Sequence, residues 1–307
     1  MATPPGPPSG TPSSTRLDLD EIAASMGAGP PSAGVSEDET ACPVLRAAAS
    51  GVMWLTGQKD GPPLPVRMNF VDRVGALCDA VGWASNELGQ RVRLDPVQVV
   101  IERAAGRGFT RNGTTSANGS CRLLGCKDGW VVCNLARPDD SELLPAVTGA
   151  KGAEGWEALQ QFASDAPAAE FARRAQLVGL PAGVVADRST RIDPVELSHL
   201  GVSVNRGHRA QRVVDFSAMW AGPLCAHALR SAGADVTTVE DPHRPDGSRL
   251  GDPGLHARLH AGHGLASYSF QELAGQEAIR RLVDAADVVV ESSRPRALAQ
   301  LGLSPQA

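Results

Sequence analysis

The sequence predicts an α/β protein with a parallel-sheet domain at its C-terminal end and a smaller α+β domain before it. Near the C-terminal end, short apolar runs typical of buried strands alternate with helical patterns. The strands are expected at 213–216, 235–240 and 287–291, and the helices at 221–232 and 271–285. Such alternation indicates parallel strands joined by right-handed crossovers. The block before it shows paired strand patterns followed by helices, which is typical of an α+β domain.

Composition along the chain divides it into five segments. Residues 1–40 are rich in Pro, Gly, Ser and Thr, and we expect a disordered leader there. Residues 41–107 are interpreted as a segment of the larger domain, and 108–203 as the small α+β domain. The polar, basic stretch 204–211 is interpreted as a linker, and 212–307 as the parallel-sheet segment.

Bulk properties exclude several classes of protein. The 307 residues are 42% hydrophobic and 21% charged, which is typical of a globular protein. A net charge of −5 argues against a nucleic-acid partner, which would select a basic face. No apolar run approaches the ~18 residues of a membrane span, and the N-terminus lacks a signal-peptide pattern. The six cysteines form no Cys-x-x-Cys pair, so we expect free thiols in a cytoplasmic protein.

An amphipathic helix is expected at 70–87, with Asp72 in its first turn. The partial positive charge of a helix N-terminus stabilises a carboxylate in that position. The breaker run 56–65 precedes the helix and predicts an ordered turn or an extended loop. The apolar side chains expected on one face of the helix are Val71, Val74, Leu77, Cys78 and Val81.

A run of small residues at 108–119 predicts a loop that approaches a ligand closely. Glycines such as Gly113 and Gly119 permit tight backbone turns that present N–H groups. The next strand patterns flank Asp128-Gly129 and predict a β-hairpin with an Asp-Gly turn. Two helical patterns follow, at 156–163 and 168–178.

Several short motifs follow one another from residue 213 onward. They are Val213-Val214-Asp215-Phe216, Ala221-Gly222-Pro223, Gly233-Ala234-Asp235-Val236, Val239-Glu240 and Ala286-Asp287-Val288-Val289-Val290-Glu291. In this order they resemble the opening of the class III CoA-transferases, a family that includes formyl-CoA transferase, carnitine CoA-transferase and 2-methylacyl-CoA racemase. The resemblance implies a Rossmann-like large domain.

The earlier half of the chain resembles a later part of the same family. Asp60-Gly61-Pro62-Pro63 stands before Asp72, as a similar turn stands before the family's catalytic aspartate. The resemblance therefore implies a catalytic role for Asp72 and an active-site role for the loop 113–119. The two halves stand in exchanged order. We interpret the chain as a circular permutant, as the middle of a tandem duplication, or as a partner subunit that completes its fold with another chain.

The resemblance implies transfer of CoA between an acyl-CoA thioester and a carboxylic acid through an aspartyl intermediate. The racemases of the family pair their aspartate with an upstream histidine. Here no histidine precedes His199, which favours transfer over racemisation. Two alternatives stay open: a non-catalytic CoA-binding or assembly subunit, and a racemase-type isomerase. Coenzyme A or acyl-CoA is expected as a substrate, with no permanently bound cofactor, in a homodimer or as a partner subunit.

The CoA site is expected at the C-terminal ends of the parallel strands, where open α/β sheets bind ligands. Arginines and helix N-termini at these strand ends suit phosphate groups. The residues expected to bind CoA are Met219, Trp220, Ala221, Arg244, Arg249, Ser292, Ser293 and Arg294, with Gly113 and Gly119 of the glycine loop. The family often has a Lys-Arg pair where this chain has His263-Gly264, which weakens the expected grip on CoA phosphates.

Three histidines, His256, His260 and His263, have the i, i+4, i+7 spacing of ligands on one helical face. Their sequence neighbours include no acidic or thiol side chain, and Gly262 and Gly264 disfavour a helix there. We therefore expect no metal site from the sequence.

Overall fold

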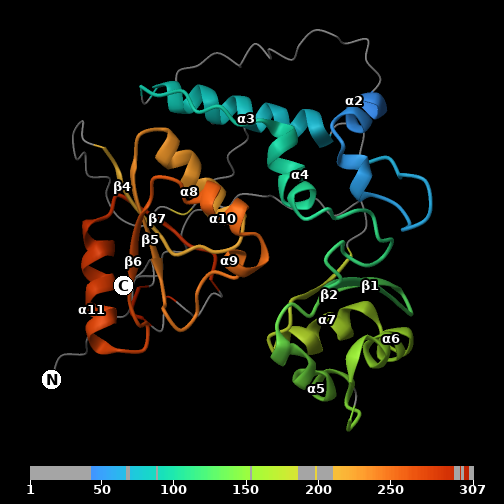
Figure 1. The fold of residues 1–307 in the computed structure, drawn as a ribbon. Helices are drawn as coiled ribbons and strands as arrows, with labels where there is room; N and C mark the ends of the chain where they lie inside the picture. The colour runs from blue at the N-terminus through green and yellow to red at the C-terminus, as the bar shows by residue number, and fades with distance from the viewer. Residues whose placement is uncertain are drawn as a thin grey trace, which may run out of the picture. The chain divides into compact units, whose positions relative to one another are not determined.

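The computed structural model describes residues 43–66, 70–87, 89–152, 154–185, 198, 210–293, 298 and 301–303 (Figure 1). Residues group into two compact units. Of the described residues, the parallel-sheet unit comprises those within 75–95 and 193–307, and the antiparallel-sheet unit comprises those within 39–74 and 96–192. The expected leader and most of the expected linker lie outside the described residues. No described helix is both long enough and apolar enough to cross a membrane.

The parallel-sheet unit contains four strands in the order β6-β5-β4-β7. Their bounds are Arg212–Asp215 for β4, Asp235–Glu240 for β5, Gly264–Ser267 for β6 and Val288–Val290 for β7. All neighbouring pairs are parallel. The strand patterns near residues 213, 235 and 288 therefore became parallel strands, as predicted. The sequence analysis did not identify β6.

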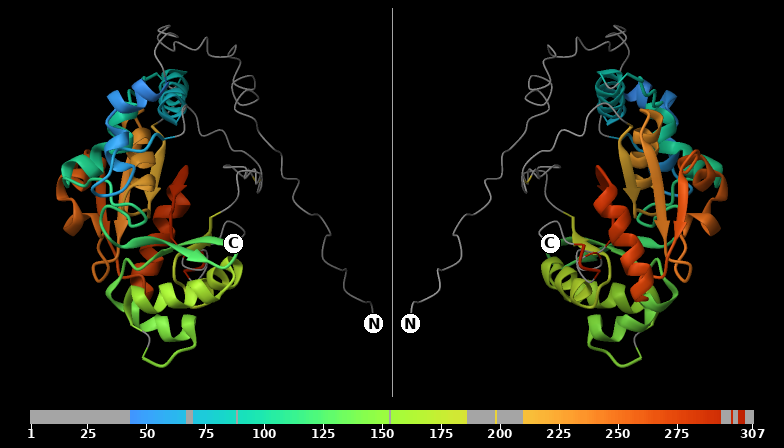
Figure 2. Two further views of the ribbon diagram at one scale, coloured as in Figure 1. Left: turned by 90° about the vertical axis from the view of Figure 1, so that its right-hand side faces the viewer. Right: turned by 90° about the vertical axis from the view of Figure 1, so that its left-hand side faces the viewer.

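Helices cover both faces of this sheet (Figures 1 and 2). Val213 packs with Ala226 of α8 (Ala221–Ser231), whereas Val214 packs with Ile279 of α11 (Leu273–Ala285). Adjacent strand residues point to opposite faces, so β4 is buried on both sides. Two short helices, α9 (Ser248–Gly251) and α10 (Pro253–Leu259), lie between β5 and β6 in the chain. A parallel sheet with helices on both faces confirms the mixed α/β prediction.

The antiparallel-sheet unit contains three strands in the order β1-β2-β3. They span Cys121–Cys126, Gly129–Asn134 and Ala182–Val184. The helical elements are the 3₁₀ turn η2 (Pro138–Leu143), α5 (Leu144–Thr148), α6 (Gly155–Asp165) and α7 (Ala168–Leu177). They enclose a core that includes fully buried Val131, Leu159 and Phe171.

The hairpin is present, but its turn differs from the predicted one. Cys126 pairs with Gly129, so Lys127 and Asp128 form the turn and Gly129 begins β2. Gly129 is not among the glycines with positive φ in the described chain. The Asp128 carboxylate instead accepts a hydrogen bond from the Ala168 amide at 2.7 Å, which ties the hairpin to the start of α7.

The remaining elements belong to the first half of the chain. They are α2 (Pro43–Ala49), the 3₁₀ turn η1 (Val52–Leu55), α3 (Phe70–Glu87) and α4 (Pro96–Gly106). The helix α3 has the predicted bounds, but its apolar residues do not share one buried face. Cys78 is buried, whereas Leu77 and Val81 are 51% and 37% exposed. The periodicity correctly predicted a helix, and the surroundings of that helix left part of its apolar face uncovered.

Candidate functional site

The loop after β4 begins at a buried carboxylate. Asp215, the last residue of β4, is fully buried. Its Oδ1 accepts hydrogen bonds from the Ser217 amide, at 2.8 Å, and from the Ser217 hydroxyl. Burial raises the pKa of Asp215, and the two bonds from Ser217 oppose that rise. The loop therefore leaves the sheet in a fixed direction.

Met219 adopts a left-handed backbone conformation, with φ of 75°, the one such non-glycine residue in the described chain. A non-glycine residue costs about 1–2 kcal/mol in this conformation, so its surroundings must hold it there. The Met219 amide donates to Oδ1 and Oδ2 of Asp246 at 3.2 and 3.1 Å. The Ala218 amide donates to the Ser292 hydroxyl at 3.3 Å. These bonds join the loops that follow β4, β5 and β7. They bring Met219 and Ser292, two of the residues expected to bind CoA, close together.

The helix α8 begins beside this group, with Trp220 as its N-cap and Ala221 as its first residue. No side chain caps its first turn, so its first amides are available to an anion. Gly222 lies so close to Ser217 that a Cβ there would meet the Ser217 Cβ at 2.1 Å. The Ala-Gly-Pro motif thus permits a close approach of helix and loop. The indole Nε1 of Trp220 is buried and lacks a hydrogen-bond partner within the described chain.

The predicted phosphate-binding residues differ in their surroundings. Arg244 is exposed at the turn after β5, where its amide donates to the Asp241 carbonyl at 2.9 Å. Arg249 donates two hydrogen bonds to Glu240, at 2.8 and 3.2 Å, so a carboxylate already balances its charge. The hydroxyl and amide of Ser293 both donate to Glu291. Arg294 lies outside the described residues. The sequence analysis did not identify Glu240 as the partner of Arg249, or Asp246 as the partner of the Met219 amide. Both contacts depend on how the strand-end segments meet in the folded chain.

In the antiparallel-sheet unit, Asp72 lies half-buried in the first turn of α3, as predicted. The loop before this helix is ordered by its own bonds. The Leu64 amide donates to the Thr56 carbonyl at 3.0 Å, and Gly57 forms a bridge with Pro63. The breaker run therefore closes into a compact turn.

This turn contacts the predicted glycine loop. Arg111 donates from its Nε to the Gly61 carbonyl at 2.9 Å, and its guanidinium lies 5.4 Å from the centre of the Trp54 ring. The Gly113 amide donates to the Gly57 carbonyl at 2.9 Å. Gly113 has φ of 62°, and a Cβ there would meet the Gln58 Oε1 at 2.4 Å. Two segments singled out separately in the sequence therefore form one structural group.

The amides of the glycine loop are largely occupied within this unit. The Ser116 amide donates to the Cys121 carbonyl at 2.7 Å, and the Gly119 amide donates to the Ser116 carbonyl at 2.8 Å. Thr115 donates to Asn112 at 3.1 Å. The expectation that this loop offers its N–H groups to a ligand is therefore not met for Gly113, Thr115, Ser116 and Gly119. Backbone hydrogen bonding of a tight loop satisfies its own donors first.

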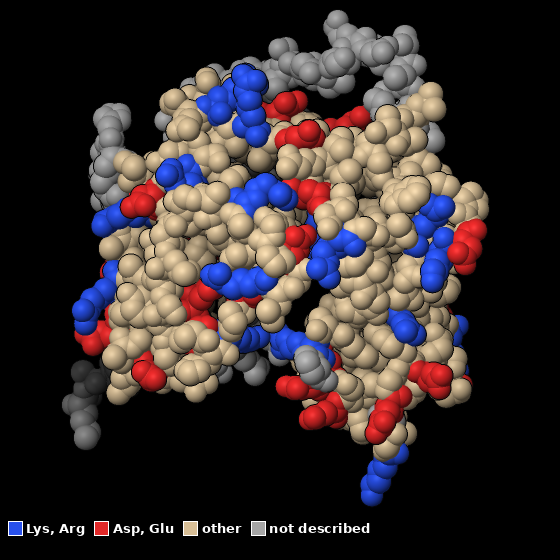
Figure 3. Space-filling model, viewed as in Figure 1, with Lys and Arg blue, Asp and Glu red and all other residues tan. Residues whose placement is uncertain are grey.

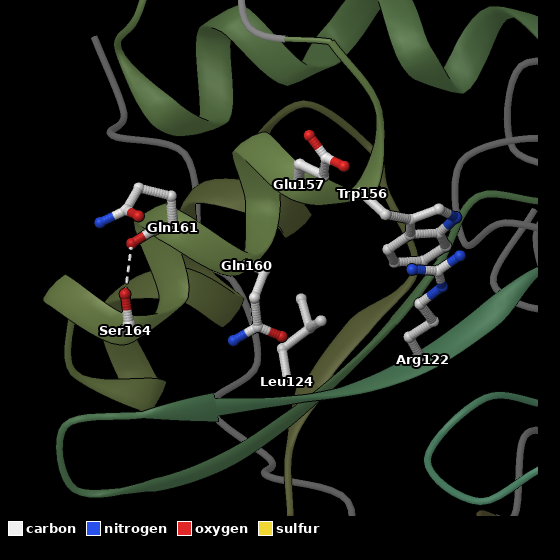
Figure 4. Close-up of a pocket in the computed structure, with 7 residues that line it drawn as sticks. All are labelled: Arg122, Leu124, Trp156, Glu157, Gln160, Gln161 and Ser164. Carbon is white, nitrogen blue, oxygen red and sulfur yellow. Dashed lines mark hydrogen bonds between the residues drawn. The ribbon is translucent and has the colours of Figure 1, made fainter.

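A surface hollow of about 340 Å³ lies elsewhere in the antiparallel-sheet unit, between β1 and α6 (Figure 4). It is lined by Arg122, Leu124, Trp156, Glu157, Gln160, Gln161 and Ser164. The Arg122 guanidinium lies 4.7 Å from the Trp156 ring centre. The sequence analysis did not identify these residues. The hollow offers a guanidinium, a carboxylate and amide groups over apolar walls, and its Ser164 hydroxyl donates to the Gln161 carbonyl.

Charge is dispersed on the molecular surface that Figure 3 presents, where basic and acidic side chains alternate without forming one large basic patch. The four-stranded parallel sheet and the small antiparallel sheet define a mixed α/β protein. The chain belongs to CoA-transferase family III, whose model matches residues 26–191 and 210–307. Family membership was thus correctly predicted from the motifs.

Individual relatives match a smaller part of the chain. A succinyl-CoA:(R)-benzylsuccinate CoA-transferase subunit of Thauera aromatica is 38% identical over 103 residues, which are 30% of this chain and 25% of that protein. An acyl-CoA transferase of Fusarium pseudograminearum is 29% identical over 107 residues, 30% of this chain and 24% of that protein. The chain spans about a quarter of the length of these curated relatives. A CAIB/BAIF family crystal structure from Brucella suis is 34% identical, with TM-score 0.28, over 31% of this chain and 28% of that one.

Proposed function

We propose that this chain takes part in moving CoA between an acyl-CoA thioester and a carboxylic acid, with Asp72 as the nucleophile. The observation that carries the proposal is membership of CoA-transferase family III, because the matched residues include Asp72 and the strand-end loops. The position of Asp72 in the first turn of an 18-residue helix supports it. A carboxylate in this position is a group that can attack a thioester carbonyl.

The proposed reaction proceeds by acyl exchange at Asp72. A carboxylate oxygen attacks the thioester carbonyl carbon, the C–S bond breaks, and a mixed anhydride and CoA thiolate form. The thiolate attacks the Asp72 carbonyl carbon and releases the first acid, which leaves an aspartyl-CoA thioester. The acceptor carboxylate attacks this thioester and forms a second anhydride, and the thiolate then takes the acceptor acyl group. Asp72 is regenerated, and no oxidant or reductant enters.

The CoA moiety is proposed to bind at the tied loops of the parallel-sheet unit. The uncapped start of α8 and exposed Arg244 favour phosphate oxygens. Met219, Trp220 and Ala221 form the backbone at the start of α8. Ser292 lies beside this backbone, because its hydroxyl accepts a hydrogen bond from the Ala218 amide. The bond of Arg249 to Glu240 argues for a smaller contribution from that arginine. The proposed donor is an acyl-CoA thioester, and the proposed acceptor is a carboxylic acid.

The experiment follows the covalent intermediate. The chain is incubated with succinyl-CoA, digested, and the peptide containing Asp72 is examined by mass spectrometry for a CoA adduct, alongside a CoA-transfer assay with several carboxylates. Asp72→Asn removes the nucleophile and is expected to abolish the adduct and to lower transfer by at least about 10³-fold. Asp79→Asn, an exposed carboxylate on the same helix, serves as the matched control. An adduct or transfer rate unaffected by Asp72→Asn contradicts the proposal.

A second candidate is a subunit that needs another chain to complete its site. The uncovered apolar side chains of α3, Phe70, Leu77 and Val81, favour it, since such side chains are usually covered by another segment. One relative is itself named a subunit. Analytical ultracentrifugation of the chain alone and with the product of a neighbouring gene tests whether the two proteins associate. A CoA-transfer assay of the same samples tests whether transfer requires both proteins. Exchange of an α-proton with D₂O in the absence of acceptor would instead favour the racemase alternative.

A further inference from the structure

Three potential metal ligands meet beside the parallel sheet, outside the residues assigned to CoA. Asp246 follows β5, His256 lies in α10, and His260 caps the C-terminal end of α10. One ligand atom from each residue lies within 4.8 Å of the other two. Asp246 and His256 are only 6% and 8% exposed. Buried acids and imidazoles need a compensating partner, so their clustering requires an explanation.

One hydrogen bond indicates which tautomer a neutral His260 ring adopts. Its Nδ1 lies 2.8 Å from the carbonyl oxygen of His256. A carbonyl oxygen only accepts, so Nδ1 carries the hydrogen and a neutral ring keeps its lone pair on Nε2. That Nε2 is buried and has no hydrogen-bond partner within the described chain. An imidazole that donates one N–H to a backbone carbonyl and presents the other nitrogen bare has the arrangement of a metal-bound histidine.

Asp246 and His256 are already oriented towards each other. Nδ1 of His256 lies 3.8 Å from Oδ2 of Asp246 and 2.9 Å from the Ser248 hydroxyl. The Ser248 amide donates to Oδ1 of Asp246 at 2.8 Å, and the Met219 amide donates to the same carboxylate. Hydrogen bonds of this kind hold a ligating carboxylate in place. The rings of His256 and His260 stack, with centres 4.1 Å apart.

We propose that Asp246, His256 and His260 form a binding site for a divalent transition-metal ion, with Zn²⁺ as the ion of choice. Three atoms at most 4.8 Å apart can all be reached from one point at about 2.8 Å, against the roughly 2.0–2.2 Å of zinc bonds. A closure of less than about 1 Å per ligand completes the site. Two imidazoles and one carboxylate form a donor set that zinc accepts, with a fourth position open.

The fold supplies what the sequence pattern lacked. Asp252, four residues before His256, caps α10 through the Leu255 amide, and the loop after β5 instead brings Asp246 to His256 from ten residues earlier in the chain. His263, the third histidine of the pattern, lies beyond the end of α10 and is not in the group whose ligand atoms lie within 4.8 Å of one another. Its Nδ1 lies 3.1 Å from the Thr238 hydroxyl.

A bound ion would also fix the loop after β4. Asp246 holds the amide of Met219 through both of its oxygens. An ion that fastens Asp246 to α10 therefore stiffens the backbone around Met219, which the proposed function assigns to CoA. The metal site itself does not depend on that assignment.

The test uses the full chain, freed of metal with a chelator and titrated with Zn²⁺ against a chromogenic competitor. We expect one equivalent to bind and to raise the free energy of unfolding, as any ligand of the native state does. His260→Ala is expected to weaken binding at least about 100-fold, since loss of a mere supporting partner costs about 10–100-fold. Its metal-free form is expected to stay folded, because the loss of the bond to the His256 carbonyl and of the ring stacking is partly offset by removal of a buried acceptor without a partner. His243→Ala, at an exposed histidine, is the matched control.

Co²⁺ distinguishes this site from the chain's thiols. Nitrogen and oxygen ligands give visible d–d bands without the near-ultraviolet thiolate-to-cobalt band of a cysteine site. The proposal is overturned by Zn²⁺ binding that His260→Ala leaves unchanged, by a thiolate band, or by the absence of saturable binding. Every readout is metal binding or its effect on the free energy of unfolding. The test therefore stays valid even if the chain does not transfer CoA.

Discussion

The backbone amide of Met219 points at the carboxylate of Asp246 and donates to both of its oxygens, at 3.2 and 3.1 Å. The bond joins the loop after β4 to the loop after β5, and it holds a methionine in a conformation that favours glycine. Asp246 is buried, so the interaction is little screened by solvent. The structure thus makes one carboxylate responsible for the backbone around the proposed CoA site.

We expect Asp246→Asn to weaken CoA binding several-fold and to destabilise the chain by about 1–3 kcal/mol, because asparagine keeps one acceptor oxygen but loses the charge and the second oxygen that hold the Met219 and Ser248 amides. Calorimetric titration with CoA and urea unfolding measure the two effects. Asp252→Asn is the matched control, since Asp252 caps α10 by accepting from the Leu255 amide at 3.0 Å. Asparagine caps helices about as well as aspartate, so this variant should change neither quantity appreciably. Equal loss of CoA affinity in both variants would count against the role of Asp246.

The ion pair between Arg249 and Glu240 leads to a second prediction. Glu240→Gln is expected to tighten CoA binding by about 2–5-fold at low salt, because the Arg249 guanidinium is no longer neutralised. The loss of stability should stay below about 1 kcal/mol for this partly exposed pair. Glu277→Gln removes the partner of Arg281 on the exposed surface of α11 and serves as control. Unchanged or weaker CoA binding in Glu240→Gln would mean that Arg249 does not contact the phosphates.

Two glycines in helices should respond oppositely to the same substitution. Gly222→Ala places a Cβ 2.1 Å from the Ser217 Cβ, and we expect a loss of about 1–3 kcal/mol from displaced packing. Gly75→Ala, within α3, meets no heavy atom within 4 Å and should gain about 0.5–1 kcal/mol from helix propensity. Urea unfolding measures both. A stabilising Gly222→Ala would show that the close contact of α8 with the β4 loop is absent.

The carboxylate of Asp241 gives a pH dependence with a defined sign. It accepts hydrogen bonds from the amides of Phe270 and His243, each at 2.8 Å, and the bond from Phe270 lowers the pKa of Asp241 below 3.8. A carboxyl whose pKa is lower in the folded state stabilises above its unfolded pKa, and this stability is lost as the pH falls through the folded pKa.

Asp241→Asn should therefore be less stable than wild type at pH 7 by no more than about 1 kcal/mol, because the group is well solvated. The difference should shrink as the pH falls below 3.8. Urea midpoints of both proteins at pH 7, 4 and 3 test this expectation. A difference independent of pH would contradict the assignment of the stabilisation to the ionised carboxylate.

Local patterns were enough to predict much of the fold. Strand and helix patterns around 213–240 depend on neighbouring residues, so the sequence predicted β4, α8 and β5 nearly at their observed bounds. The same holds for the position of Asp72 in the first turn of α3. The ordered motifs predicted the family correctly. The catalytic role of Asp72 and the exchanged order of the halves remain predictions.

The sequence by itself determined the elements of this protein, because apolar spacing and breaker residues act within a few residues of one another. Only the tertiary structure decided which polar groups meet. Arg249 faces Glu240, Met219 is held by Asp246, and that carboxylate also reaches His256, which lies in a separate helix. Such contacts depend on where the strand ends of a parallel sheet place their loops. The spacing of residues along the chain carries no information about that placement.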